Sequence, residues 1–226
     1  MKDIIEFVPP LLNGALITIE ITLISIIFAM LGGLILAIVR VHRTPVISTL
    51  VVIFVDLMRG TPLLLQIFYI YYVLPLAGLT LGSFTAGVIA LSLNYSAYLS
   101  EVFRSGINAV PRGQTEAAWS LGLTPRQKLL DIVIPQAIRI VIPSVGNYFV
   151  ALFKDSALVS TIALAELMRT GQLLAATTYK HFLIYSLVAV FYLAMSYPAS
   201  WFVLWLERHF MIGRRSSQLG LGDKPL

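Results

Sequence analysis

The stretch from Glu116 to Pro135 reads EAAWSLGLTPRQKLLDIVIP, and it contains the most informative spacing in the chain. E-A-A is followed by three residues, Gly122, nine residues and the closing I-V-I-P. Apolar runs long enough to span a bilayer lie on both sides of it, yet the stretch itself is too polar to enter one. A polar segment in this position indicates an extramembrane loop with a role of its own.

Two helix signals, separated by a glycine, lie in this loop. Residues 115–119 favour a helix, and Gly122 stands where that helix would end and can adopt the positive φ of a sharp bend. Thr124 is then suited to cap a second helix, with Pro125 at its first position. Helix, glycine and helix together predict a compact elbow.

The composition places the whole chain in the membrane class. Only 12% of the 226 residues are charged and 58% are hydrophobic, whereas soluble domains carry about a quarter charged residues. The absence of cysteine excludes a disulfide framework, a zinc-cysteine cluster and a thiol nucleophile. There is no clustered catalytic set, no metal site is predicted, and no G-x-x-x-x-G-K phosphate loop occurs. We therefore expect neither catalysis nor a cofactor in this chain.

Apolar runs predict an all-α membrane protein with five transmembrane helices in one domain, residues 1–226. A bilayer core of about 30 Å needs roughly 20 apolar helical residues. The expected spans cover residues 15–39, 46–74, 83–103, 137–153 and 182–206, and residues 104–136 form the polar loop.

Lysine and arginine in the loops predict the orientation. With five spans, segments 40–45, 104–136 and 207–226 share one side, which carries ten of these residues against three on the other. The polar loop and the C-terminus are therefore expected in the cytoplasm, and the N-terminus outside. The net charge of +5 is interpreted as this topology signal and not as a nucleic-acid site.

The second expected span carries charges and a helix break. Asp56 and Arg59 are three residues apart on one helical face and are predicted to pair. Irregular backbone at membrane depth is tolerated only where it lines a cavity or is buried in protein. We therefore expect a substrate pathway here, formed by Asp56, Arg59, Gly60, Thr61, Pro62 and Leu63. The alternative is a structural ion pair that holds a kink.

Polar residues also form a stripe on the third span. Asn94, Tyr98 and Glu101 lie at i, i+4 and i+7, on one helical face. Asn94 and Tyr98 are deep enough to line a pathway. Glu101 lies nearer the cytoplasmic end, three residues before Arg104, and is interpreted as a structural pair or a gate.

The fourth span is short and ends in Lys154, Asp155 and Ser156. The apolar residues after it are too few to cross, so we expect a re-entrant or interfacial half-helix that starts near Ser156. Its free N–H groups would suit a carboxylate of the substrate. Asp155, Asp56 or Glu166 would then meet an ammonium group or a basic side chain of the substrate; alternatively, Glu166 lies at the outer surface near Arg169.

The spacing of residues 116–135 resembles the cytoplasmic coupling loop of bacterial ABC-importer permeases, with Ile134 where leucine is usual. Four further stretches resemble the polar amino acid permease family: RGTPLL at 59–64, YSAY at 95–98, residues 106–114 and KDSAL at 154–158, which adds Leu158 to the expected pathway. The resemblance covers about residues 12–215. It implies the type I ABC importer fold and coupling to an ATPase through Glu116, Ala117, Ala118, Gly122, Ile132 and Pro135.

The same resemblance implies the partners and the localisation. A pair of ABC ATPase subunits would bind ATP and Mg, and a second permease copy or a sister permease would complete the membrane part. An extracytoplasmic amino-acid-binding protein would deliver the substrate to this multi-pass protein of the bacterial inner membrane.

The charges of the expected pathway favour one class of amino acid. Asp56, Asp155 and Glu166 against Arg59 and Lys154 leave one negative charge, which favours arginine, lysine or histidine, with glutamine as the rival. The alternative function is an ion-coupled secondary transporter, although such proteins usually have more spans and internal repeats.

Overall fold

The computed structural model describes residues 2–42 and 45–210, and every regular element in those two ranges is helical. The α-helices are α1 (Lys2–His42), α2 (Pro45–Gly60), α3 (Leu63–Phe68), α4 (Ser83–Asn108), α5 (Arg112–Ser120), α6 (Pro125–Gln127), α7 (Ile134–Asp155), α8 (Leu167–Thr178) and α9 (His181–Phe210). Two π-helical turns, η1 (Tyr69–Val73) and η3 (Lys128–Val133), and two 3-10 turns, η2 (Leu74–Ala77) and η4 (Ser156–Ile162), complete the list. The predicted all-α class is confirmed.

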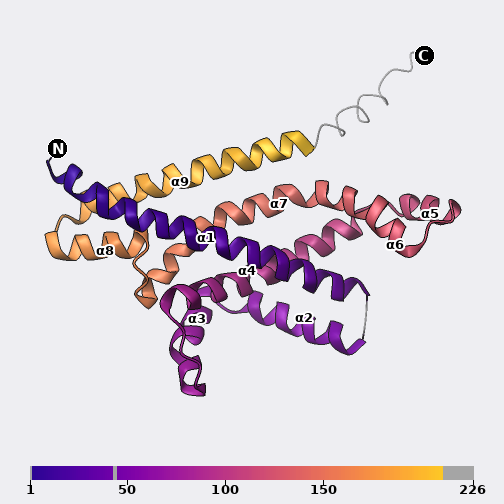
Figure 1. The fold of residues 1–226 in the computed structure, drawn as a ribbon, viewed down its shortest axis with the longest axis horizontal. Helices are drawn as coiled ribbons and strands as arrows, with labels where there is room; N and C mark the ends of the chain where they lie inside the picture. The colour runs from indigo at the N-terminus through magenta and orange to yellow at the C-terminus, as the bar shows by residue number, and fades with distance from the viewer. Residues whose placement is uncertain (1, 43–44, 211–226) are drawn as a thin grey trace, which may run out of the picture.

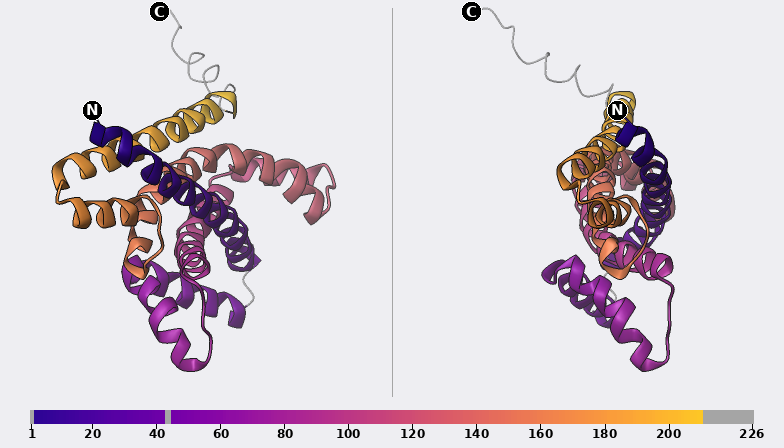
Figure 2. Two further views of the ribbon diagram at one scale, coloured as in Figure 1. Left: turned by 60° about the vertical axis from the view of Figure 1, so that its left-hand side comes forward. Right: turned by 90° about the vertical axis from the view of Figure 1, so that its left-hand side faces the viewer.

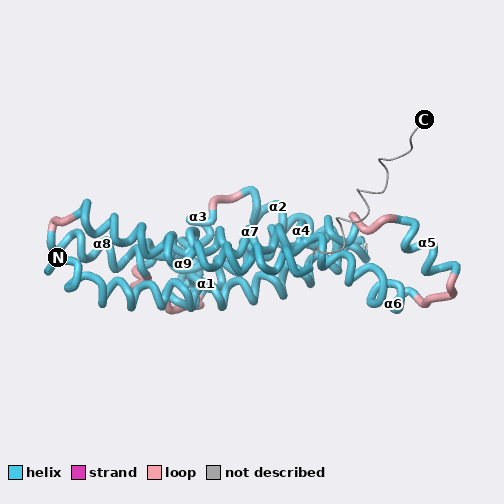
Figure 3. Tube along the Cα trace, turned by 90° about the horizontal axis from the view of Figure 1, so that it is seen from above, coloured by secondary structure: helices cyan, strands magenta, loops and turns pink. Residues whose placement is uncertain are grey.

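The long helices α1, α4, α7 and α9 follow the long axis of the molecule (Figure 1). The N-terminus lies at one end of that axis, and α5 and α6 lie at the other end. Seen from above, the same elongated bundle has the α5–α6 segment extending beyond the other helices (Figure 3). The predicted elbow is therefore a terminal projection of the bundle.

Helix α4 is the centre of the bundle, since α1, α2, α3 and α7 all pack against it. Gly32 and Gly33 let α1 approach closely: a Cβ at Gly33 would lie 2.9 Å from Cβ of Leu99. Polar residues of α4 such as Ser92 and Ser100 are buried inside the protein. The helix thus places its polar face against other helices.

Three helical stretches within the described ranges are long and apolar enough to cross a membrane: Ile4–Val41, Pro125–Ile162 and His181–Phe210. A fourth results if Pro45–Gly60 and Leu63–Ala77 count as one broken span. Helix α4 is not among them, because buried polar residues lower its hydropathy. The count of five spans stays a prediction.

The second expected span, residues 46–74, is not one straight helix. Helix α2 ends at Gly60, and the chain bends by 107° before it continues from Leu63 to Ala77. Pro62 has no N–H to donate and disfavours helical geometry at the residue before it. The segment after the bend therefore projects from the bundle (Figure 2).

The expected half-helix beginning at Ser156 is also absent from this structure. Helix α7 continues into the 3-10 turn Ser156–Ile162, so the backbone N–H of Ser156 donates to Leu152 and is not free. The chain then turns at Ala163, with φ of 59°, and α8 begins after Glu166. The prediction that a helix N-terminus at Ser156 binds a carboxylate was wrong, because helical hydrogen bonding continues past Ser156 without interruption.

Candidate functional site

The elbow has the local geometry that its sequence predicts. Gly122 has a φ of 70°, directly after α5. Thr124 caps α6: its side chain accepts from the backbone N–H of Gln127, and the Gln127 side chain accepts from the backbone N–H of Thr124. Pro125 occupies the first turn of that short helix. Each feature depends on residues close in sequence.

The six predicted coupling residues differ in exposure. Glu116, Ala117, Gly122 and Pro135 are exposed and Ile132 is half-buried, whereas Ala118 is 2% exposed. We expected both alanines to receive a partner surface. Because α5 packs against the π-helical turn before α7, the small side chain of Ala118 serves contacts within the chain instead.

The outer surface of the elbow also contains apolar residues that the sequence analysis did not select. Leu121 is 78% exposed at its tip. Trp119 is 52% exposed, and the Lys128 ammonium lies 4.6 Å from the centre of its ring. Their position just before Gly122 is the sequence signal that could have identified them.

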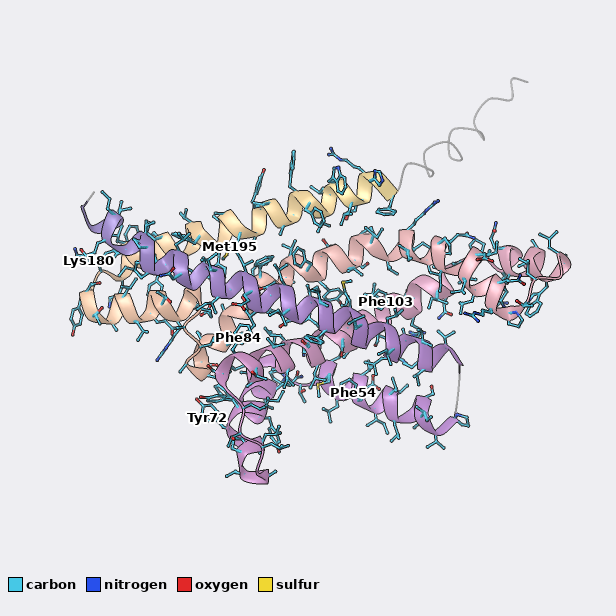
Figure 4. All side chains as sticks on the ribbon, viewed as in Figure 1. Phe54, Tyr72, Phe84, Phe103, Lys180 and Met195 are labelled. Carbon is cyan, nitrogen blue, oxygen red and sulfur yellow. The ribbon has the colours of Figure 1, made fainter. Side chains whose placement is uncertain are left out.

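A cavity of about 470 Å³ lies where the break after α2 faces α4 and α7. Residues from three separate parts of the chain surround it. Its lining contains Arg59, Gly60, Thr61, Pro62, Leu63, Asn94, Tyr98 and Asp155, all expected pathway residues, together with Tyr95, Tyr148 and Ala151, which the sequence analysis missed. Figure 4 labels Phe84, near the beginning of α4, and Phe103, further along the same helix. Tertiary packing thus brings most of the expected pathway residues together.

The lining of this cavity has one guanidinium and one carboxylate, separated by tyrosine rings. The Arg59 guanidinium lies 5.5 Å from the centre of the Tyr98 ring. The Tyr95 hydroxyl donates to the Asp155 carboxylate over 2.7 Å. Tyr148 packs edge-on against Tyr95, with ring centres 6.1 Å apart, and also contacts Tyr98. The arrangement offers separate partners for an anionic and a cationic group.

A buried amide network supports the broken backbone beside the cavity. The Gln66 side-chain amide donates to the carbonyl of Met58 over 2.8 Å and to the Thr61 hydroxyl over 2.8 Å. Asn94 donates to the Gln66 amide oxygen over 3.0 Å and to the same Met58 carbonyl over 3.2 Å. These amides satisfy backbone carbonyls that the helix break leaves open. Asn94 lines the cavity, but its amide nitrogen already donates to Met58 and Gln66 at the helix break.

Besides Glu166, which is described below, four expected pathway residues lie outside the cavity lining in other surroundings. Asp56 is exposed and, in the described part of the chain, has no ion pair with Arg59, which approaches Glu101 instead. Lys154 is exposed. Ser156 is buried, and its hydroxyl donates to Phe153, while Leu158 packs against the hydrophobic core. The prediction of an Asp56–Arg59 pair was wrong, because Arg59 turns toward α4.

Glu166 is neither a ligand in this cavity nor a surface residue beside Arg169, so both interpretations of it were wrong. It is fully buried and caps α8, accepting from the backbone N–H groups of Met168 and Arg169 over 2.9 and 2.7 Å. Its carboxylate also accepts from the hydroxyls of Thr18 and Tyr192. The side chain therefore joins α1, α8 and α9.

Glu101 forms the pair with Arg104 that its spacing predicts, at 2.7 Å. The structure adds a second partner, Arg40 from α1, and brings the Arg59 guanidinium of α2 to 3.9 Å. Three guanidinium groups thus converge on one carboxylate where α1, α2 and α4 meet.

Comparison with known proteins agrees with this architecture. Residues 29–212 match the family model described as binding-protein-dependent transport system inner membrane component. The chain is 36% identical over 196 residues to a probable amino-acid ABC transporter permease protein of Sinorhizobium fredii, covering 87% of this chain and 85% of that protein. It is 40% identical over 186 residues to the L-cystine transport system permease protein of Bacillus subtilis, covering 82% and 80% of the two chains.

A solved structure extends the similarity to three dimensions. The crystal structure of an amino acid ABC transporter with histidines has a TM-score of 0.87 and 36% identity, covering 92% of this chain and 97% of that chain. Family, relatives and fold agree, and the fold is that of a type I ABC importer permease. This chain therefore belongs to the family of binding-protein-dependent transport system inner membrane components, the non-catalytic membrane permeases of ABC importers.

Proposed function

We propose that this chain is the translocation subunit of an ATP-driven importer of polar amino acids. A second permease copy or a sister permease completes the membrane part, and an extracytoplasmic binding protein delivers the substrate. ATP and Mg bind to the ATPase subunits. The observation that supports this function best is the cavity with Arg59 and Asp155 in its lining, beside the helix break after α2.

The charges of the cavity suit the groups that all α-amino acids share. An α-amino acid carries one carboxylate and one ammonium group. Arg59 offers planar guanidinium donors to the carboxylate, and Asp155 offers an acceptor to the ammonium group. The Tyr95 hydroxyl holds Asp155 in place, so little ordering of that side chain is needed when substrate binds.

The side chain of the substrate is proposed to be uncharged. The sequence count favoured a cationic amino acid, but it included Asp56, Glu166 and Lys154, none of which line the cavity. With those three removed, one positive and one negative group remain, and the substrate backbone uses both. A cationic side chain would then lack a carboxylate partner, so glutamine is the proposed substrate.

The elbow is proposed to dock onto the ATPase subunits. It stands at one end of the bundle and exposes Glu116, Ala117 and Leu121 (Figure 1). Glu116 offers a charge to a partner arginine, and Leu121 offers an apolar contact. Closure of the ATPase pair would displace the elbow and, through the continuous helix that follows it, α7.

Transport assays test the function and the substrate together. The permease, its ATPase subunits and its binding protein are reconstituted in proteoliposomes, and accumulation of radiolabelled glutamine, arginine, lysine, histidine and cystine is measured with and without ATP. We expect ATP-dependent accumulation of glutamine above the others. Preferential uptake of arginine or lysine would overturn the substrate proposal, and uptake driven by an ion gradient without ATP would favour a secondary transporter.

Cysteine labelling tests the orientation. Because the natural chain has no cysteine, Leu121→Cys places a single thiol at the tip of the elbow. We expect a membrane-impermeant maleimide to label it in inverted vesicles and not in intact cells. Labelling in intact cells would place the elbow outside and would exclude its contact with ATPase subunits.

A further inference from the structure

A second cavity lies between α4 and α7, beyond the proposed substrate cavity. It has a volume of about 330 Å³ and is lined by residues of these two helices, among them Glu101, Arg104 and Ser105 of α4 and Val141 and Ser144 of α7. Because the elbow joins the end of α4 to the beginning of α7, the two helices run antiparallel (Figure 1). The second cavity therefore lies between the first cavity and the elbow.

Both helices carry one continuous stripe along the two cavities. On α4 the stripe is Asn94, Tyr98, Glu101 and Ser105, at i, i+4, i+7 and i+11. On α7 the residues at 144, 148, 151 and 155 have the same spacing. The rings of Tyr98 and Tyr148, 5.7 Å apart, line the first cavity, and the next residues of the two stripes, Glu101 and Ser144, line the second. The two cavities thus follow one another along the same faces of α4 and α7, and we call the boundary between Tyr98 and Glu101 the constriction.

The constriction contains the only charge contact between the two linings that is found in the described residues. Arg59 lines the first cavity, Glu101 lines the second, and their charged groups lie 3.9 Å apart. Glu101 is held more closely by Arg40 and by Arg104, the latter at 2.7 Å. Arg59 is therefore the most distant of its three partners.

We propose that Glu101 is a positioning residue that competes with the substrate carboxylate for Arg59. This inference rests on the proposed function of the first cavity. A substrate carboxylate that binds Arg59 directly would form charge-assisted hydrogen bonds of about 2.7–2.9 Å, shorter than the present contact with Glu101. Arg59 then moves toward the substrate, and its link across the constriction is released.

Release of Arg59 does not leave the half-buried carboxylate of Glu101 without a partner. Glu101 keeps Arg40 and Arg104, so the large penalty for an unpaired buried charge is avoided. The contact between the cavities can therefore open with a small free-energy change. An occupied first cavity opens the way to the second, and an empty one keeps it closed.

The end of the second cavity nearer the elbow is closely packed. This packing is consistent with a release of Arg59 that precedes movement of α7. A Cβ at Gly106 would lie 2.2 Å from a Cγ of Val141, so α4 and α7 are in direct contact there. That contact lies at the end of the second cavity nearer the elbow, whereas the Arg59–Glu101 contact lies at the end nearer the proposed substrate cavity. Movement of α7 by the elbow would act on the Gly106–Val141 contact. Binding of substrate would act on the Arg59–Glu101 contact.

Two variants separate a competitor from a structural ion pair. Glu101→Gln removes the carboxylate that competes for Arg59, so glutamine affinity should rise about threefold and ATP hydrolysis without substrate should increase. Arg104→Gln removes a different partner of Glu101 and leaves Glu101 to hold Arg59 more firmly. Glutamine affinity should then fall about threefold.

Affinity is measured by equilibrium dialysis of radiolabelled glutamine with the purified permease–ATPase complex, without binding protein. A purely structural cluster would shift both variants in the same direction, and that result, or an unchanged affinity in Glu101→Gln, would overturn the proposal. If Glu101→Gln does not assemble, Glu101→Asp replaces it: the shorter side chain withdraws from Arg59, and affinity should rise less. A wild-type complex that binds no amino acid would overturn the function proposed for the first cavity instead.

Discussion

The elbow and the cavity are built in opposite ways. In the elbow, Gly122 and the Thr124–Gln127 cap determine the bend through contacts within a few residues. In the cavity, Tyr95 meets Asp155 across 60 positions of sequence, and Asn94 meets Gln66 across 28. A contact between neighbours follows from local chemistry, whereas a distant contact follows from how whole helices pack. The two regions should therefore respond differently to mutation.

The largest expected effect is on substrate affinity, from the Asp155 side of the cavity. Asp155→Asn should weaken glutamine binding to the permease–ATPase complex by about 2–3 kcal/mol, because a charged hydrogen-bond acceptor for the ammonium group is lost. Tyr95→Phe removes only the 2.7 Å hydrogen bond to Asp155 and should cost about 1 kcal/mol. Equilibrium dialysis measures both. Equal losses in the two variants would contradict a direct role for the carboxylate.

The hydrogen bonds that Gln66 makes at the helix break should contribute to the stability of the protein. Gln66→Leu leaves the Thr61 and Met58 carbonyls with fewer donors and should destabilise the protein by about 2 kcal/mol, lowering the melting temperature in detergent by about 5 °C.

Asn94→Leu supplies the control for that experiment. Because Asn94 and Gln66 serve the same Met58 carbonyl, the double variant should cost less than the sum of the single variants. Fully additive costs would show that the two amides act independently, against the network described above.

In the elbow, the expected effect is on coupling. Valine at position 122 is strained at a φ of 70°, at a cost of about 1–2 kcal/mol, so Gly122→Val should lower substrate-stimulated ATP hydrolysis about tenfold. Gly122→Asn is the matched control, since asparagine tolerates this conformation and should keep most of the activity. Wild-type rates in the valine variant would show that the bend is not needed for coupling.

The smallest expected effect is a gain in stability outside both regions. Ala163 has a φ of 59°, so Ala163→Gly should stabilise the protein by up to about 1 kcal/mol and raise the melting temperature by about 2–4 °C. Ala165→Gly tests for a general glycine effect and should not stabilise. An unchanged melting temperature in Ala163→Gly would mean that the turn is not strained.

The sequence predicted the cavity in part, and the residues show why. Gly60 and Pro62 mark a break in an apolar run, so their place beside a cavity could be expected. Tyr148 and Ala151 carry no comparable signal, because an aromatic or small residue in an apolar helix is usually part of the core. Only the packing of α7 against α4, which brings the rings of Tyr148 and Tyr98 to 5.7 Å, places them in the lining.

The charged residues show the limit most clearly. Spacing predicted the Glu101–Arg104 pair correctly, since i and i+3 are neighbours on any helix. The same argument predicted Asp56 with Arg59, but Arg59 lies near Glu101 on another helix. Glu166 has the sequence features of a pathway residue and is a buried cap. Which neighbour a charge selects depends on helix packing.

By itself, the sequence determined the helical membrane class, the elbow and its caps, and the family to which the chain belongs. Hydropathy, glycine conformation and capping act over one or two turns, so they can be identified without knowledge of the fold. Tertiary structure alone decided that Tyr95, Tyr148 and Ala151 line the cavity with Arg59 and Asp155, that Arg40 and Arg59 also approach Glu101, and that Glu166 is buried. Those outcomes depend on which helices lie side by side, and local sequence does not specify that.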